Sequence, residues 1–139
     1  MISVAVGIIV NSKSPDHVLL CQRRRASRYP LKWEFPGGKV EPGEEAETCL
    51  RRELEEELGI SGEIGTIYHR QQHAYADSGS FDVVYYRVSS FSGDIVNRVF
   101  ETYRWVRIPE LARYDILEGN QEVVRKLMSE HAAVVADTN

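Results

Sequence analysis

Long apolar runs, cysteine and excess positive charge are all scarce in this chain. No stretch approaches the roughly 18 apolar residues that a membrane-spanning helix needs. Residues 1–10 lack the charged start and the cleavage site of a secretory signal. The formal net charge of −4 at pH 7 disfavours a protein that coats nucleic acid. We therefore expect a cytoplasmic protein that acts on neither membranes nor nucleic acid polymers.

Cysteine is limited to two residues, Cys21 and Cys49. The first falls in an expected strand and the second on the apolar side of an expected helix, so we predict two buried core residues and no disulfide. The 139 residues, 42% of them hydrophobic, suffice for one domain with its own core, and no repeat divides the chain. We predict a single domain over 1–139 that works as a monomer or a homodimer.

The most informative stretch is residues 38–60, GKVEPGEEAETCLRRELEEELGI. Nine positions of this stretch match a pattern of set spacing, seven by residue identity and two by apolar character. They are Gly38, Glu44, Arg52, Glu53, Leu54, Glu56, Glu57, Gly59 and Ile60. At average residue usage such a pattern arises by chance with a probability on the order of 10⁻⁸. The pattern therefore indicates a functional motif.

Residues 45–58 are rich in Glu, Ala, Leu and Arg and predict a helix that ends at Gly59, a residue suited to a left-handed C-cap. Glu53, Glu56 and Glu57 stand at i, i+3 and i+4, so the three carboxylates share one face. Like charges at this spacing repel unless a cation lies between them. Clustered oxygen ligands of this kind suit Mg²⁺ or Mn²⁺.

A solvated acidic surface is the alternative explanation of such a helix. The preceding loop favours a site, because Gly37 and Gly38 allow the backbone to approach a ligand and Glu44 is delivered toward the helix start. Arg52 follows Arg51 and precedes Glu53. It can hold carboxylates through paired hydrogen bonds, or it forms only a weak surface ion pair.

Apolar patterns predict the other elements. We expect extended segments over residues 3–10, 17–23, 33–38, 66–73, 81–88, 95–100 and 101–107, and a last helix over 121–131. The nearly continuous run at 3–10 is typical of a strand covered on both faces. His69 and His73 share one face of a strand about 13 Å apart, so we do not expect them to bind one metal ion.

Four arginines, Arg23, Arg24, Arg25 and Arg28, precede the glycine loop. They form either a basic surface loop or contacts with a phosphate or base. Phe35 can pack on a flat ligand or fill the core.

On these residues the chain resembles the Nudix hydrolases, and among them the MutT type. The similarity covers nearly the whole chain: AVGII in the first strand, WEFPGGKVEPGE, the Nudix box at 38–60, Trp105, and a last helix opened by Asn120. It implies an α+β Nudix fold, with a mixed β-sheet sandwiched between α-helices. It also implies hydrolysis of a nucleoside diphosphate linked to a further phosphate or other group.

The resemblance also implies roles for single residues. Glu53, Glu56 and Glu57 would bind Mg²⁺, with Mn²⁺ as a possible substitute, helped by the carbonyl of Gly37. Glu44 and Arg52 would orient the cluster, and Glu53 is favoured as the base that activates water. Substrate contacts are expected from Arg23, Phe35, Gly38, Lys39 and Asn120.

Two positions depart from the MutT pattern. The metal-contacting Glu expected six residues before Trp105 is replaced by Val99, which makes Glu101 the nearest candidate ligand. The closing Asn120 lacks its usual flanking prolines and stands in LEGNQEVV. Its amide can read a base by accepting from N7–H and donating to O6 of 8-oxoguanine, or it can cap the last helix.

The leading functional expectation is a pyrophosphohydrolase that cleans the nucleotide pool by converting 8-oxo-dGTP to the monophosphate and pyrophosphate. CTP, dCTP or ADP-ribose are alternative substrates for the same chemistry. A non-catalytic Nudix module for ligand sensing or interaction is the alternative of another class, and the complete set of box glutamates argues against it.

Overall fold

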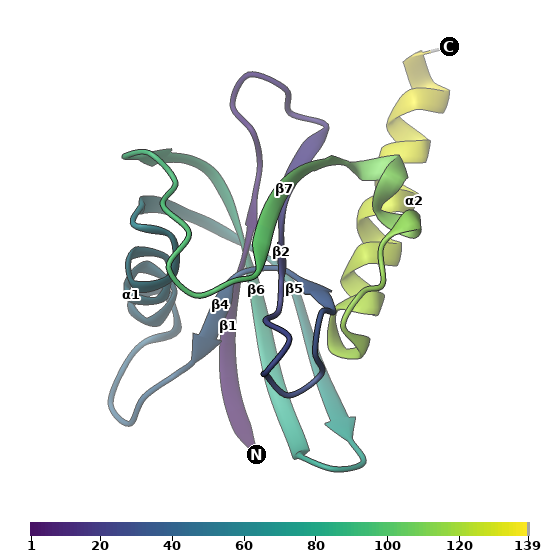
Figure 1. The fold of residues 1–139 in the computed structure, drawn as a ribbon. Coiled ribbons are helices and arrows are strands. Elements are labelled where there is room, and N and C mark those ends of the chain that lie inside the picture. Colours follow the sequence, from purple (N-terminus) through teal and green to yellow (C-terminus); the bar gives the residue numbers. More distant parts are fainter. Residues whose placement is uncertain (139) are drawn as a thin grey trace.

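The computed structural model describes residues 1–138, which form two β-sheets placed between two helices (Figure 1). The strands are β1 (Ile2–Ile9), β2 (His17–Gln22), β3 (Trp33–Glu34), β4 (Gly37–Lys39), β5 (Ser61–Tyr75), β6 (Gly79–Ser92) and β7 (Thr102–Arg107). The order of the strands is β4-β1-β6-β5 in the first sheet and β3-β2-β7 in the second. Helices α1 (Ala46–Leu58) and α2 (Gln121–Thr138) lie on opposite sides of the strands, and 3-10 helices cover Ile108–Arg113 and Glu118–Asn120.

Strand β1 lies at the centre because both of its faces are apolar. Val6 and Ile8 pack in the core that α2 covers, whereas Ala5 and Ile9 pack in the core that α1 covers. β1 pairs parallel with β6 and antiparallel with β4, so the first sheet is mixed. The expected α+β fold with a mixed sheet between helices is confirmed, with the strands divided over two sheets.

Helix α1 follows the prediction to within one residue. It buries Cys49, Leu50, Leu54 and Leu58 and ends at Gly59, which adopts a left-handed φ of 66°. Free Cys21 and Cys49 are both buried in the α1 core, as expected. Helix α2 continues past residue 131, the expected end. No helix within residues 1–138 has the length and apolarity to span a membrane.

The expected extended segment at 95–100 is wrong. Residues 93–101 form a loop, although Ile95, Val96 and Val99 give them the composition of a strand. Asn97 bonds to the N–H and the carbonyl of Phe100 within the loop. The backbone N–H groups of Val96 and Arg98 donate to carbonyls at the C-terminal end of α1, so they cannot donate to a neighbouring strand. Strands β5 and β6 are instead longer than predicted and form one hairpin.

Candidate active site

Two glycines allow β4 to lie close to its neighbours. A Cβ on Gly37 would lie 2.1 Å from the carbonyl oxygen of Ala5 in β1. A Cβ on Gly38 would lie 2.3 Å from the carboxyl carbon of Glu53 in α1. Any side chain at either position would therefore separate the strand from β1 or displace the carboxylate. The glycines bring the box helix and the strand into direct contact.

Arg52 joins the carboxylates of the box. Its Nε and Nη2 donate to the two oxygens of Glu44 at 2.8 and 2.9 Å, a bidentate arrangement. Its Nη1 donates to Glu53 at 3.0 Å and to Glu56 at 3.2 Å. These hydrogen bonds hold the pKa of Glu44 at about 2, with Arg52 as the main cause. One guanidinium thus donates to three carboxylates and compensates only part of their charge.

Glu57 is the carboxylate that Arg52 does not reach. Its Oε1 accepts a hydrogen bond from the N–H of Gly37 at 3.2 Å. Burial, followed by the charges of Glu53 and Glu34, raises the pKa of Glu57 to about 9. Burial also raises the pKa of Glu53 above its usual range, although Arg52 opposes the shift. Negative charge at this face of α1 is therefore only partly compensated by the protein.

The donor set on α1 fits a divalent cation. Glu53, Glu56 and Glu57 offer hard oxygen ligands. Burial and the neighbouring carboxylates raise the pKa of Glu57, and a cation bound there would favour its charged form. Within residues 1–138 no three acidic, histidine or cysteine side chains converge as a ready-made metal cage. The reason is that these carboxylates are directed toward Arg52 and the N–H of Gly37. Binding a cation would require them to exchange some of these partners.

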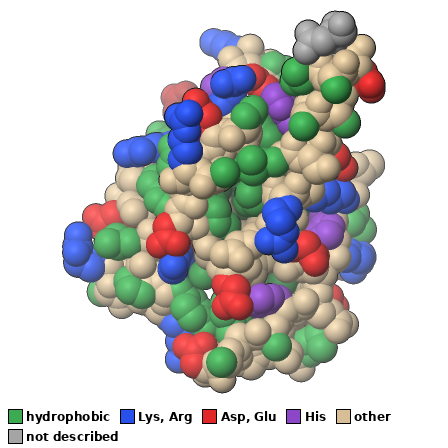
Figure 2. Space-filling model, turned by 90° about the vertical axis from the view of Figure 1, so that its right-hand side faces the viewer, with side chains coloured by type: hydrophobic (Ala, Val, Ile, Leu, Met, Phe, Trp, Pro, Cys, Tyr) green, Lys and Arg blue, Asp and Glu red, His purple; other side chains and the backbone are tan. Residues whose placement is uncertain are grey.

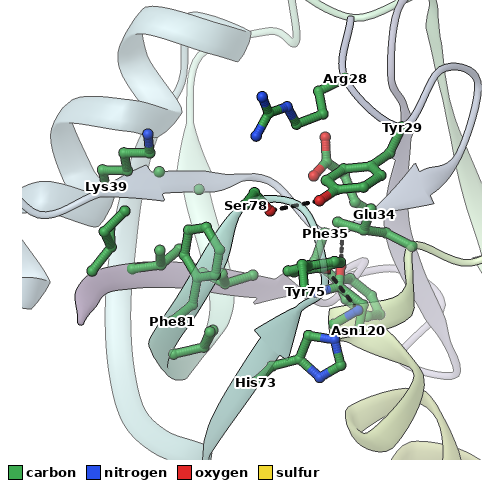
Figure 3. Close-up of a pocket in the computed structure, with 18 of the residues that line it drawn as sticks. Arg28, Tyr29, Glu34, Phe35, Lys39, His73, Tyr75, Ser78, Phe81 and Asn120 are labelled. Carbon is green, nitrogen blue, oxygen red and sulfur yellow. Dashed lines mark hydrogen bonds between the residues drawn. The ribbon is translucent and has the colours of Figure 1, made fainter.

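A cavity of about 570 Å³ adjoins the box at Gly37 and Gly38 (Figure 3). This volume is in the range of small-molecule sites. The five expected substrate contacts all line it: Arg23, Phe35, Gly38, Lys39 and Asn120. Phe35 is 3% exposed and belongs to the α2 core, so it serves as a wall of the cavity and as a core residue.

Asn120 has a fixed orientation at the floor of this cavity. Its Oδ1 accepts from the N–H of Phe35 at 3.0 Å, and its Nδ2 donates to the hydroxyl of Tyr85 at 3.0 Å. Tyr85 in turn donates to the carbonyl of Gly119 at 3.0 Å. Because the backbone N–H can only donate, the amide oxygen must face Phe35. The side chain makes these tertiary bonds and no cap bond to α2 is found in residues 1–138.

The arginines differ from the expectation. Arg23 lines the cavity, but its guanidinium is bonded to Glu34 at 3.1 and 3.2 Å and to the carbonyl of Arg28 at 2.7 Å. Arg28 also lines the cavity, is exposed, and extends over it toward the side of Lys39 (Figure 3). Among residues 1–138 its side chain has no ion-pair partner within 4.0 Å. Of the two arginines that line the cavity, Arg28 is thus the one whose guanidinium is not already paired with a carboxylate within residues 1–138.

Glu101 stands apart from the carboxylate cluster. It is exposed just before β7, and its N–H donates to the carbonyl of Gln22. In the described chain its carboxylate has no ion pair or hydrogen bond with any box residue. The geometry gives the expected role of Glu101 as a metal ligand no support.

Several lining residues were missed by sequence reasoning. Tyr29 stacks on Tyr75 with ring centroids 4.9 Å apart, and its hydroxyl bonds to Asp77 at 2.5 Å and Ser78 at 2.6 Å. These contacts join the arginine loop to the β5–β6 turn beside the cavity. The partly buried Glu34, the ion-pair partner of Arg23, was also missed, although it lies in the WEFPGG segment.

A polar row along β5 faces the start of α2. His69 pairs with Glu122 at 2.7 Å, Gln71 donates to Gly119, and His73 lies 3.8 Å from Glu118. The two histidines have separate acidic neighbours. Acidic, basic and histidine side chains are interspersed over this side of the molecule (Figure 2). Residues 69–73 are polar at every position, so the sequence carried no alternation that would have identified this row.

Comparison with known proteins agrees with the site. The sequence model of the NUDIX domain matches residues 1–127. The chain belongs to the Nudix family. It is 33% identical to an 8-oxo-dGTP diphosphatase of Haemophilus influenzae, over 94% of this chain and 93% of that protein. It is 32% identical to a CTP pyrophosphohydrolase of Escherichia coli, over 99% of this chain and 98% of that protein.

Structural similarity to the MutT type is equally extensive. A solved MutT of Aliivibrio salmonicida or Vibrio cholerae matches with a TM-score of 0.78 at 32% identity, over 93% of this chain and 98% of that one. The resemblance to MutT-type Nudix proteins is confirmed, and this Nudix protein is a hydrolase.

Proposed function

We propose that this Nudix hydrolase cleaves nucleoside triphosphates to the monophosphate and pyrophosphate, with 8-oxo-dGTP as its preferred substrate. The observation that favours 8-oxoguanine over ordinary guanine is the fixed amide of Asn120 at the floor of the cavity. The proposed place of this activity is the nucleotide pool of the cytoplasm.

The hydrogen-bonding capacity left on Asn120 matches the oxidised base. A side-chain amide has two acceptor lone pairs and two N–H donors. Phe35 uses one lone pair and Tyr85 uses one N–H, so one acceptor and one donor remain. They can accept from N7–H and donate to O6 of 8-oxoguanine. On the same edge ordinary guanine offers two acceptors, which would leave the amide oxygen facing a lone pair at a cost of about 1 to 3 kcal/mol.

The box supplies the chemistry in this proposal. Glu53, Glu56 and Glu57 would hold Mg²⁺, with Mn²⁺ as a substitute and the carbonyl of Gly37 as a further ligand. When bound, the metal neutralises phosphate charge and lowers the pKa of a coordinated water. Glu53 is the proposed base, since burial raises its pKa and Gly38 leaves the space beside its carboxylate clear of a side chain.

Glu44 and Arg52 act as orienting residues. The bidentate pair fixes the guanidinium, which then restricts Glu53 and Glu56 by a hydrogen bond to each. Exposed Arg28 and Lys39 are placed to meet the phosphates at the mouth of the cavity. Buried Phe35 would contact the face of the base.

CTP is a second candidate substrate. The E. coli CTP pyrophosphohydrolase matches over 99% of this chain. The remaining donor and acceptor of Asn120 also suit cytosine, which offers a donor at N4 beside an acceptor at N3. The Asn120 amide alone therefore does not separate cytosine from 8-oxoguanine.

A substrate panel tests the proposal. Turnover of 8-oxo-dGTP, dGTP, CTP, dCTP and ADP-ribose would be measured with Mg²⁺ and with Mn²⁺, and the products identified as monophosphate plus pyrophosphate or otherwise. We expect the highest kcat/KM for 8-oxo-dGTP. A higher value for CTP would favour the second candidate. Absence of turnover for every nucleotide would contradict the proposed activity.

A further inference from the structure

The loop at residues 93–101 is bonded to the C-terminal end of α1. The N–H of Val96 donates to the carbonyl of Leu58 at 2.9 Å, and the N–H of Arg98 donates to that of Glu57 at 3.0 Å. The guanidinium of Arg98 donates through Nη1 to the carbonyl of Glu55 at 2.9 Å. The last carbonyls of a helix lack i+4 partners within it, and the loop supplies donors for those of Glu57 and Leu58. The carbonyl of Glu55 accepts from the N–H of Gly59 and, in addition, from Arg98.

Arg98 also provides charge that α1 lacks. The helix has no basic residue in its last turn, where Glu55, Glu56 and Glu57 follow one another. A helix C-terminus carries partial negative charge, which a cation stabilises by about 0.3 to 1 kcal/mol at an exposed position. Arg98 Nη2 would lie 3.2 Å from a Cβ built on Gly59, so the guanidinium is packed against the helix cap.

We propose that Arg98 is a positioning residue of the hydrolase, which fixes the last turn of α1 so that Glu56 and Glu57 are held in place for the metal. Arg98 binds the backbone of the helix that carries the proposed ligands, through its own N–H and through its guanidinium. This inference rests on the proposed metal-dependent function.

The hydrogen bonds specify how Arg98 acts. Its backbone N–H and its side chain bind carbonyls two residues apart, Glu57 and Glu55, so the arginine spans part of the last turn. Loss of the side chain would leave the carbonyl of Glu55 bonded to the N–H of Gly59 alone at 3.0 Å. The turn would then be freer to unwind, and the ligand carboxylates would be less well ordered.

Metal binding in the absence of nucleotide tests the proposal. Arg98→Ala and Arg98→Lys would be compared with wild type by calorimetric Mg²⁺ and Mn²⁺ titration and by the Mg²⁺ dependence of turnover. We expect Arg98→Ala to bind Mg²⁺ about tenfold more weakly, with kcat at saturating Mg²⁺ reduced less than about threefold. Arg98→Lys, which keeps a donor and the charge, should recover part of the affinity.

Arg113→Ala is the matched control, because Arg113 is an exposed arginine paired with Glu110 away from α1. Its metal affinity should equal that of wild type. Unchanged Mg²⁺ affinity in Arg98→Ala, with or without a lower Tm, would overturn the positioning role. If Arg98→Ala does not fold, unchanged Mg²⁺ affinity in Arg98→Gln would do the same. Failure of the wild-type protein to bind Mg²⁺ would instead contradict the proposed function.

Discussion

The two ends of the site are held in opposite ways. At the carboxylate end, acidic groups are crowded, one guanidinium compensates several of them, and the pKa of Glu57 rises to about 9. At the base end, Asn120, Tyr85 and the backbone of Phe35 satisfy one another before any ligand enters. Under the proposed function, the carboxylate end would therefore need a cation to balance its charge, whereas the end at Asn120, which would contact the base, is already bonded in place. Loss of a residue should accordingly alter metal dependence at one end and substrate preference at the other.

Glu57→Gln should have the largest effect. We expect turnover to fall on the order of a thousandfold, because a partly buried ligand for the proposed metal is lost. In metal-free buffer at neutral pH the variant should nevertheless melt several degrees above wild type, since it does not have to take up a proton in order to fold. Turnover and melting in EDTA would be measured together. Near-normal turnover would contradict the metal-binding role of the α1 face.

Glu57 should also make the stability of the metal-free protein depend on pH. The pKa of Glu57 is about 9 in the folded protein against a usual value of 4.5, so folding takes up a proton at intermediate pH. Metal-free wild-type stability should therefore fall as pH rises through this window and level off above it. Glu57→Gln should lack this contribution. Identical pH profiles of denaturant unfolding for both proteins would show that the carboxyl of Glu57 is not the cause.

Arg52→Gln tests how one cation orders the carboxylate end. Without the guanidinium, Glu44, Glu53 and Glu56 lose their shared partner. We expect kcat to fall about a hundredfold and the Mg²⁺ requirement to rise. Arg51→Gln is the control, because Arg51 is half exposed and pairs only with Glu47 in the described chain. Equal kinetics for the two variants would remove the orienting role from Arg52.

Asn120→Ala tests the base end. It removes the acceptor for the N–H of Phe35, so stability should fall by about 1 to 3 kcal/mol. The preference for 8-oxo-dGTP over dGTP should fall roughly tenfold or more. Asn120→Asp separates the two effects, because a carboxylate can still accept from Phe35 but has no N–H for O6. A preference that survives in both variants would show that Asn120 is structural only.

Arg28→Ala should have a smaller effect, confined to KM. If Arg28 meets the phosphates, its loss should raise KM about three- to tenfold, and more at low than at high salt. Arg25→Ala serves as control, since Arg25 is exposed and is not among the residues that line the cavity. Equal KM values for both variants at low salt would show that Arg28 does not contact the substrate.

Glu101→Gln should have the least effect. Its exposed carboxylate has no contact with the box in residues 1–138, so we expect kcat and Mg²⁺ dependence within about twofold of wild type. A loss of tenfold or more, about 1.4 kcal/mol, would show that the loop delivers this carboxylate to the metal during the reaction.

Sequence reasoning was most successful where a function depends on local spacing. The face of Glu53, Glu56 and Glu57 follows from helical periodicity. Gly38 was expected to let the backbone approach a ligand, and in the structure it leaves room for the carboxylate of Glu53. The strand expected at 95–100 failed for a tertiary reason: the loop gives its N–H groups to α1, which no local pattern reveals.

The choice of Arg23 over Arg28 shows the same limit. Their order in the sequence does not reveal that β2 and β3 pair so that Arg23 reaches Glu34 and is neutralised there. Likewise, the contact of Tyr29 with Asp77 joins residues 48 positions apart. Such partners depend on how the chain folds back on itself, and the spacing of residues along the sequence does not predict these contacts.

The bond from Phe35 to Asn120 links residues 85 positions apart. Closing a long loop is entropically costly, so contacts of this kind form late unless others have already brought their ends together. Strand β4 and α1 are close in sequence and can associate early, while the floor of the cavity must await the arrival of α2. Amide hydrogen exchange at Phe35 should therefore report detachment of the C-terminal segment, and a chain still emerging from the ribosome would possess the box before it possesses a base pocket.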